Sequence, residues 1–530
     1  MTKGAYVLRD VLIIDGAGTP GFRGDVRIQD GRIAEVGSAS PAKGTTVIHG
    51  EGRILCPGFI DVHSHLDFTL FDNPGCLNLV AQGITLAVGG NCGFSAGPTG
   101  ENMARYQELR GRGGWRGSLA EWFEEVEALG VGLNVASYVG EGNLRGDVMG
   151  VDNRDTPSDA DIARMTEILR GALEDGAFGL STGRDYVPGC YSDAADIARL
   201  ATELGRHAGS FYVSHLLDES AGLVEATREA LEIGRRAGVP TLLSHHKAVV
   251  PVNRGLTETS LSLVDEALRN GEDARLDVYP YDFSATIHLF DMLPTRLTQQ
   301  GRETTLRILE DDAEFAPFAR DLHTGYPGWT SALADFDWGY TMLVSPGYPE
   351  VEGRTVGDIA DLWGLDPAQA VRRMVLADGG TSVCSLTMAE EDVARVIAHP
   401  RAAICTDSAA MDTPEGNFRT SVHPRSYGTY PRFFARYVRE REILSLEEAV
   451  HRCTGLPAAW LGLSDRGILR PGARADLVLF DPMTIQDRAT LDEPTRSPRG
   501  IDLVLVNGVP VIEEDRPTGA RPGAIVRRGD

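Results

Sequence analysis

Short apolar runs alternate with helical segments through the middle of this chain, and that alternation constrains the fold more than any other feature. The runs have the length and near-continuous hydrophobicity of strands that are buried on both faces. Eight such strands are predicted, at residues 59–65, 84–91, 132–139, 178–182, 211–215, 241–245, 274–279 and 402–407. Apolar residues recur at helical spacing between them, over residues 158–175, 193–207, 220–237 and 258–270. A further helix is predicted after the capping-box sequence that runs from Ser118 to Glu121.

Repeated strand–helix units of this kind favour a closed parallel barrel, the TIM (β/α)8 barrel, over an open sheet. The two ends of the chain have a different texture, with short strand-like runs and tight turns. Neither end has enough strands to bury a core alone, so we expect them to pair into one small β-sandwich domain. The predicted organisation assigns residues 1–57 and 466–530 to this small domain and residues 58–465 to the barrel.

One long interval, residues 289–346, interrupts the barrel rhythm between the seventh and eighth predicted strands. Connections of this length inside a compact domain are usually functional. We therefore expect an insertion before strand eight. The sequence leaves open whether it is an active-site lid or a helical hairpin that only packs.

The overall composition excludes several classes of partner. The formal net charge of −25 repels phosphate backbones, so nucleic acid is not an expected partner. No stretch approaches the roughly 18 apolar residues of a membrane-spanning helix, and the N-terminus lacks the pattern of a signal peptide. The 7 cysteines are scattered without a CxxC pair, which does not suggest a disulfide framework. These observations predict a cytoplasmic protein that does not bind membranes.

Metal-ligating side chains stand at the ends of the first two predicted strands, where barrel enzymes carry their reactive groups. The first strand ends in His63 and His65, which share one face because side chains alternate along a strand. Two imidazoles at this spacing can hold one metal ion. The second strand runs into a glycine-rich turn that carries Cys92, whose thiolate can reach the same mouth.

Three later strands end in the same kind of residue. His215 ends the fifth strand and Asp407 the eighth, and a carboxylate there can contact a metal and take a proton from water. The sixth strand ends in two adjacent histidines, of which one can face the mouth. We assign His245 as the ligand and expect Lys247, on the same face, to reach the substrate. His246 then points away and packs.

Six candidate metal ligands therefore converge on one mouth of the predicted barrel. Imidazole nitrogens together with a thiolate favour Zn2+ among the common metals. The six are His63, His65, Cys92, His215, His245 and Asp407. We expect one tight zinc site and a second, weaker position.

Motifs along nearly the whole chain resemble those of the N-acyl-D-amino-acid deacylases in the amidohydrolase superfamily. The matching segments are 90–93 (GNCG), 179–183 (GLSTG), 244–247 (SHHK), 279–281 (YPY), 423–428 (HPRSYG) and 470–478 (RPGARADLV). Many amidohydrolases bridge two metals with a carbamylated lysine on strand four, where this chain has Ser181 and Thr182. The D-aminoacylases resemble this chain in using the strand-two cysteine instead. The resemblance implies zinc-dependent hydrolysis of linear amides, with N-acyl-D-amino acids as the expected small-molecule substrates.

Roles for the candidate residues follow from this resemblance. Cys92, His215 and His245 are expected to hold the tight zinc, and the remaining three ligands the second position. Asp407 is the expected catalytic residue, which accepts the proton of the attacking water and delivers it to the leaving amine.

Substrate contacts are also implied. Lys247 and Tyr279 are implied to bind the substrate carboxylate, and Tyr186 is a further candidate contact. For a second cation the sequence leaves a choice among Arg184, Arg425 and Arg296, of which we take Arg425 as the candidate.

Three loops depart from the usual family sequences and put the substrate in question. Glu141 replaces the histidine of the usual Gly-His-Gly-Thr-Leu-Arg, Leu217 replaces the arginine of Thr-His-x-Arg-x-Glu-Ser, and Arg184-Asp185 replaces a Leu-Glu pair. The alternatives are an amidase that tailors a larger natural product or peptide-like substrate, a hydantoinase-like hydrolase of cyclic amides, and a non-catalytic barrel scaffold. The missing strand-four lysine argues against the cyclic-amide reading. The sequence does not indicate the oligomeric state.

Overall fold

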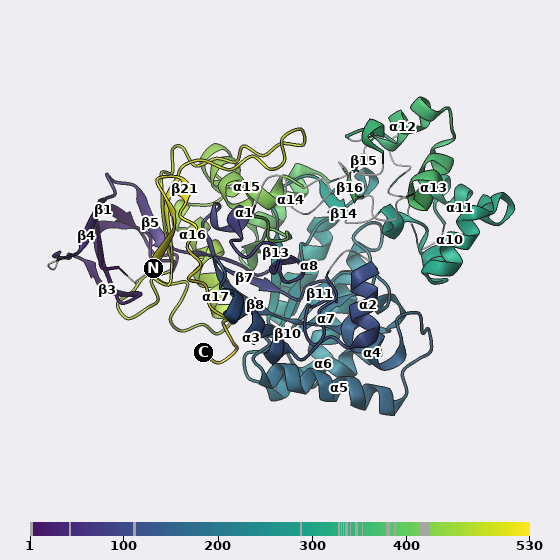
Figure 1. The fold of residues 1–530 in the computed structure, drawn as a ribbon, viewed down its shortest axis with the longest axis horizontal. Coiled ribbons are helices and arrows are strands. Elements are labelled where there is room, and N and C mark those ends of the chain that lie inside the picture. The colour runs from purple at the N-terminus through teal and green to yellow at the C-terminus, as the bar shows by residue number, and fades with distance from the viewer. Residues whose placement is uncertain are drawn as a thin grey trace.

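The structure of the chain is a computed structural model (Figure 1). It describes residues 4–41, 44–109, 113–286, 289–326, 329, 331, 333, 338–339, 341–344, 348–351, 353–377, 382–385, 388–412 and 423–530. No helix within these ranges has the length and apolarity needed to span a membrane. The cytoplasmic location expected from the sequence stays a prediction.

Parallel strands form the centre of the molecule, and each of the eight predicted strands is confirmed. Two parallel sheets contain them, in the orders β6-β7-β8 and β17-β13-β12-β11-β10-β9. The strands are β6 (Phe59–Asp61), β7 (Ile84–Gly89), β8 (Asn134–Ser137), β9 (Val139–Gly140), β10 (Gly179–Gly183), β11 (Phe211–His215), β12 (Thr241–Leu243), β13 (Ala274–Val278) and β17 (Ala402–Ile404). Nearly all of their residues are buried, as near-continuous apolar strands require.

The two parallel sheets are connected at both sides. β8 and β9 belong to one stretch of chain, interrupted only at Tyr138. Beyond the ends of β6 and β17, the Asp407 N–H donates to the His63 carbonyl (2.9 Å) and the His65 N–H donates to the Ser408 carbonyl (2.8 Å). These bonds continue the parallel pairing past the strands themselves and align the residues that follow them.

A single apolar cluster fills the space between the strands. It contains inward-facing residues of β6, β7, β8, β11, β12 and β17, among them Ile60, Leu86 and Phe211. Trp460 from α17 (Gly455–Trp460) and Val526 near the C-terminus join the same cluster. The residues of the two parallel sheets that face each other therefore pack into one apolar core.

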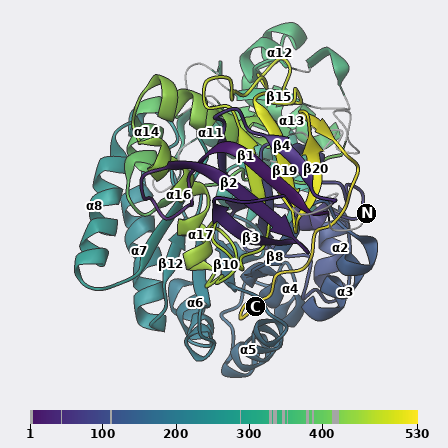
Figure 2. The ribbon, with the colours of Figure 1, turned by 90° about the vertical axis from the view of Figure 1, so that its left-hand side faces the viewer.

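Helices cover the outside of these strands (Figures 1 and 2). The predicted helices are confirmed as α3 (Leu119–Leu129), α5 (Asp159–Glu174), α6 (Ala194–Ala201), α7 (Leu223–Ala237) and α8 (Leu256–Arg269). Ser118 caps α3 through the expected capping box with Glu121.

Strands from both ends of the chain lie in one nine-stranded sheet (Figure 2). It contains β1 (Tyr6–Ile13), β2 (Phe22–Gln29), β3 (Arg32–Gly37), β4 (Thr46–His49) and β5 (Ile54–Pro57), with β18 (Leu477–Phe480), β19 (Ile501–Val506), β20 (Val509–Glu513) and β21 (Arg516–Pro517). β5 pairs antiparallel with β18, so the two chain ends meet directly. The domain boundaries at residues 57 and 465 stay a prediction.

The expected insertion forms part of a larger lobe with its own apolar cluster, drawn from residues 289–383. The cluster joins α10 (Arg302–Glu310) and α11 (Asp312–Thr324) to α12 (Val356–Trp363) and α13 (Pro367–Ala377). The four helices lie at the end of the molecule opposite the nine-stranded sheet (Figure 1). A lid role for this lobe stays a prediction.

Candidate metal centre

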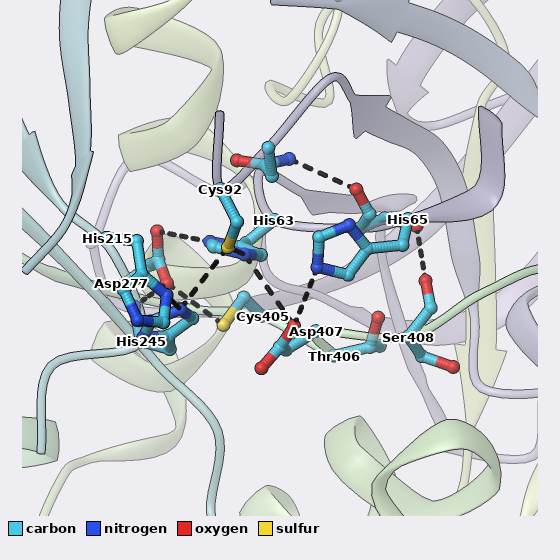
Figure 3. A network of polar contacts seen from close by, with 12 residues as sticks. His63, His65, Cys92, His215, His245, Asp277, Cys405, Thr406, Asp407 and Ser408 are labelled. Carbon is cyan, nitrogen blue, oxygen red and sulfur yellow. Dashed lines mark hydrogen bonds and ion pairs between the residues drawn. The ribbon is translucent and has the colours of Figure 1, made fainter. Parts of the chain in front are cut away.

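The structure brings the six predicted ligands together at the carboxyl ends of the parallel strands (Figure 3). His63 and His65 follow β6, and Cys92 lies in the turn after β7. His215 is the last residue of β11, His245 follows β12, and Asp407 follows β17. Each ligand therefore comes from the segment where the sequence placed it.

The ligand atoms are close enough to share metal ions. Cys92 Sγ lies 3.4 Å from His63 Nε2 and 3.5 Å from His245 Nε2, and His215 Nδ1 lies 2.9 Å from His245 Nε2. Ligands of one tetrahedral zinc, at about 2.0–2.3 Å from the ion, lie roughly 3.3–3.8 Å apart. The two distances from Cys92 Sγ fall in this range, and the two histidine nitrogens, at 2.9 Å, need to separate by a few tenths of an ångström to hold the same ion.

Three overlapping triads have ligand atoms within 4.8 Å of one another. They are His63-His65-Cys92, Cys92-His215-His245 and His63-His245-Asp407. Cys92 belongs to two of the triads, so its thiolate lies between two candidate metal positions. The predicted division into a tight site of Cys92, His215 and His245 and a second position of His63, His65 and Asp407 stays a prediction.

The turn that carries Cys92 is held in an unusual backbone conformation by β10. Cys92 has a φ of 53°, between two glycines that also have positive φ. The Ser181 hydroxyl donates to the Gly90 carbonyl (2.5 Å) and accepts from the Gly93 N–H (3.2 Å). A Cβ on Gly183 would lie 2.1 Å from the Cys92 carbonyl oxygen, so only glycine fits there. In the sequence, Ser181 is notable only because a lysine is absent there, and nothing indicates that it supports this turn.

A buried carboxylate, Asp277, lies behind the histidines and was also missed. Its Oδ1 accepts from the His245 N–H (2.5 Å) and from the Cys405 thiol (3.1 Å). Its Oδ2 lies 3.4 Å from His63 Nδ1, the ring nitrogen opposite the one that faces Cys92. A carboxylate in this place orients a metal-ligating imidazole and fixes its tautomer. The available signal was its position in β13, two residues before Tyr279.

The charges in the cluster favour the ligand forms of Cys92 and Asp407, while Asp277 and Cys92 raise the pKa of His63 against the effect of burial, so this histidine must release a proton to bind a metal. Burial alone would raise the pKa of the Cys92 thiol, but the imidazoles of His63 and His245 outweigh it and hold that pKa well below its usual value. Burial alone would also raise the pKa of the Asp407 carboxyl. The charge of Arg425 and the hydrogen bond with His65 outweigh burial and hold this pKa well below its usual value. A thiolate and a carboxylate are therefore both available to a cation.

The four predicted substrate contacts surround this cluster. Lys247 Nζ lies 5.7 Å and the Arg425 guanidinium 4.7 Å from the centre of the Tyr279 ring. Arg425 Nη2 is also 3.0 Å from Asp407 Oδ2. The Tyr186 ring centre lies 5.0 Å from that of His215.

The other candidate residues pair with groups outside the cluster. Arg184 pairs with Glu229 of α7, and Arg296 pairs with Asp321 in the lobe. Arg425 is thus the one of the three candidate arginines that contacts a candidate ligand. His246 points away, as expected, and its Nε2 lies 2.8 Å from the Ser260 hydroxyl of α8.

Parallel strands with histidine, cysteine and aspartate gathered at their carboxyl ends are typical of metal-dependent hydrolases. Residues 46–512 match a family model described as "Amidohydrolase family". An N-acyl-D-glutamate deacylase of Alcaligenes xylosoxydans xylosoxydans is 37% identical over 518 residues, which are 97% of this chain and 95% of that protein. The chain therefore belongs to the amidohydrolase family and, within it, to the N-acyl-D-amino-acid deacylases.

Solved structures agree with this assignment. The chain is similar to an N-acyl-D-glutamate deacylase from Bordetella bronchiseptica, with a TM-score of 0.83 and 35% identity over 99% of this chain and 100% of that one. That structure is complexed with zinc and a phosphonate mimic of the tetrahedral intermediate. A D-aminoacylase with a binuclear metal centre has a TM-score of 0.82 and 31% identity, covering 100% of both chains.

Proposed function

We propose that this protein is a zinc-dependent enzyme that hydrolyses the amide bond of N-acyl-D-amino acids, giving a carboxylate and a free amino acid. The observation that carries the proposal is the cluster of Cys92, His215 and His245 beside Asp407, with Lys247 and Arg425 on its substrate side. The deacylases to which the chain is similar supply the substrate class.

The protein's own residues divide the work of the reaction. Zinc held by the cluster supplies Lewis-acid activation of the scissile carbonyl and of water. Asp407 accepts the proton of the attacking water at a carboxylate oxygen and delivers it to the leaving amine. Lys247, Tyr279 and Arg425 bind the substrate carboxylate and so fix the amide over the cluster, while Tyr186 lines the same side.

We also infer that the eight parallel strands close into a TIM (β/α)8 barrel. The bonds between the ends of β6 and β17 and the shared interior cluster support closure. Cys92, His215 and His245 form the tight zinc site in this proposal, and His63, His65 and Asp407 complete the weaker one next to the same thiolate.

The alternatives have less support. Hydrolysis of cyclic amides would call for a lysine on strand four of the barrel. That strand is β10, and it carries Ser181 and Thr182 instead. A scaffold has no need for six converging ligands. An amidase acting on a larger substrate uses the same cluster, and a substrate panel separates it from the deacylase.

Amine release from matched N-acetyl-D- and N-acetyl-L-amino acids, with apolar and acidic side chains, tests the proposal. The zinc content of the same protein is measured in parallel. Turnover confined to the D series supports it and identifies the side-chain class. If zinc-loaded protein hydrolyses neither series, the deacylase proposal is refuted and an amidase that acts on a larger substrate is favoured.

A further inference from the structure

Glu219, in the loop after β11, contacts the candidate metal site and the candidate substrate lysine at once. Its Oε1 lies 2.9 Å from His245 Nδ1 and 2.5 Å from Lys247 Nζ. The Glu219 side chain is 12% exposed, whereas those of His245 and Lys247 are 2% and 6% exposed. A single carboxylate oxygen therefore joins two side chains that have different roles in the proposed reaction.

The hydrogens of this contact can be counted. Lys247 Nζ carries three donors, and it lies near three groups: Glu219 Oε1, the His245 carbonyl (3.2 Å) and His245 Nδ1 (2.8 Å). The third contact is a hydrogen bond only when Nδ1 has no proton, which places the ring proton on Nε2.

Metal binding excludes that arrangement. His245 Nε2 is the atom that faces Cys92 Sγ and His215 Nδ1 in the ligand cluster, and a ligand nitrogen carries no proton. The ring proton is then on Nδ1 and is donated to Glu219, as is typical of a metal-ligating histidine with a carboxylate behind it. The contact between Nδ1 and Nζ becomes one between two donors, so the third Lys247 hydrogen needs another acceptor.

We propose that Glu219 is a positioning residue that orients His245 toward the metal and, through the same oxygen, directs the third Lys247 hydrogen to the carboxylate of the substrate. This inference rests on the proposed function for the identity of the substrate group. One substitution at Glu219 should therefore weaken both metal binding and substrate binding.

The loop around Glu219 provides a matched control. Asp218, its neighbour, accepts from the Ser220 N–H (2.6 Å) and hydroxyl (2.5 Å) and from the Gly222 N–H (3.0 Å), so it shapes the loop. The Val249 N–H donates to the Glu219 carbonyl (2.8 Å) and ties this loop to the segment after Lys247. None of these four hydrogen bonds involves the Glu219 carboxylate.

The experiment compares E219Q and D218N with the unmodified full-length protein. Zinc affinity is measured by titrating the metal-free protein in competition with a chromophoric chelator, and kcat and KM are measured at saturating zinc. For E219Q we expect zinc affinity to fall by about 10- to 100-fold. We expect KM to rise about tenfold, because a charged hydrogen bond that positions Lys247 is lost, with kcat changed less than about threefold.

D218N is expected to lower the melting temperature while it keeps both zinc affinity and KM. The proposal is overturned if E219Q binds zinc like the unmodified protein, if its KM at saturating zinc is unchanged, or if D218N weakens zinc as much as E219Q does. An unmodified protein that hydrolyses none of the substrates refutes the proposed function alone. The zinc titration then still decides whether Glu219 supports His245.

Discussion

Replacing Asp407 with asparagine separates proton handling from metal holding. The substitution preserves volume but removes the carboxylate that lies 3.2 Å from His65 Nε2 and 3.0 Å from Arg425 Nη2. Removal of a positioned general base or acid typically costs 10²- to 10⁴-fold in rate, which is about 3–5 kcal/mol of transition-state stabilisation. We therefore expect D407N to lose turnover by this factor.

Zinc at the tight position should survive the same substitution. Cys92, His215 and His245 form a triad that does not include Asp407, so zinc content and affinity at that position should stay within about threefold of the unmodified protein. Turnover is accordingly expressed per bound zinc. This comparison distinguishes a lost proton acceptor from a lost metal.

Stability must be monitored in the same samples. Asparagine removes the ion pair between Asp407 and the buried Arg425 guanidinium, and breaking a buried ion pair costs as much as about 3–5 kcal/mol. D412N is the control, because Asp412 lies in the same segment and its carboxylate accepts, among the described residues, from the backbone N–H groups of Gly75 and Leu77. It should lose stability and keep its turnover per zinc. Turnover of folded D407N within tenfold of the unmodified enzyme would show that Asp407 does not carry the proton.

Three further perturbations follow from the contacts of described residues. D277N should weaken zinc binding at the second position about 10- to 100-fold in a chelator competition, because the carboxylate next to His63 is lost; unchanged affinity at that position contradicts this role. Chelation should abolish turnover and lower the melting temperature, because zinc at about 1,000 times its Kd adds roughly 4 kcal/mol to the free energy of unfolding. C92S should show no zinc-dependent rise in melting temperature by calorimetry. Burial lowers the pKa of His399 below its usual 6.5, and the hydrogen bond with Asp265, which raises this pKa, offsets only part of the effect. Below about pH 6.5 the unfolded chain therefore binds more protons than the folded protein, so stability falls as the pH falls. Urea midpoints should therefore fall from pH 7 to pH 5, with a shallower fall in H399Q; equal slopes refute this assignment.

The sequence could predict the strands and the ligands for the same physical reason. Apolar runs of strand length identify parallel buried strands, and residues that follow parallel strands must meet at one edge. His63, His65 and Asp407 could be located by this rule without knowledge of any tertiary contact. The choice of His245 over His246 needed only the alternation of side chains along a strand, and His246 indeed packs against Ser260.

The supporting residues could not be predicted in this way, because their roles depend on distances between separate strands and loops. Asp277 resembles any buried polar residue in a strand until its Oδ2 is seen beside His63 Nδ1. Glu219 lies four residues after His215, in a loop whose path the sequence does not fix. Among the three candidate arginines, only the structure shows that Arg184 and Arg296 pair with carboxylates other than Asp407.

Ser181 shows how the absence of one metal ligand and the presence of another are physically linked. A long lysine at this inward-facing position of β10 could not replace the two hydrogen bonds with which Ser181 holds Gly90 and Gly93. Without them, the turn loses the side-chain hydrogen bonds that hold its two glycines, while the positive φ of Cys92 still costs of order 1 kcal/mol or more for a residue other than glycine. A short hydroxyl on β10 therefore allows the cysteine turn to approach the histidines, and the thiolate then occupies the position between two candidate metal sites. In this chain, the change on strand four and the cysteine after strand two form a single structural solution.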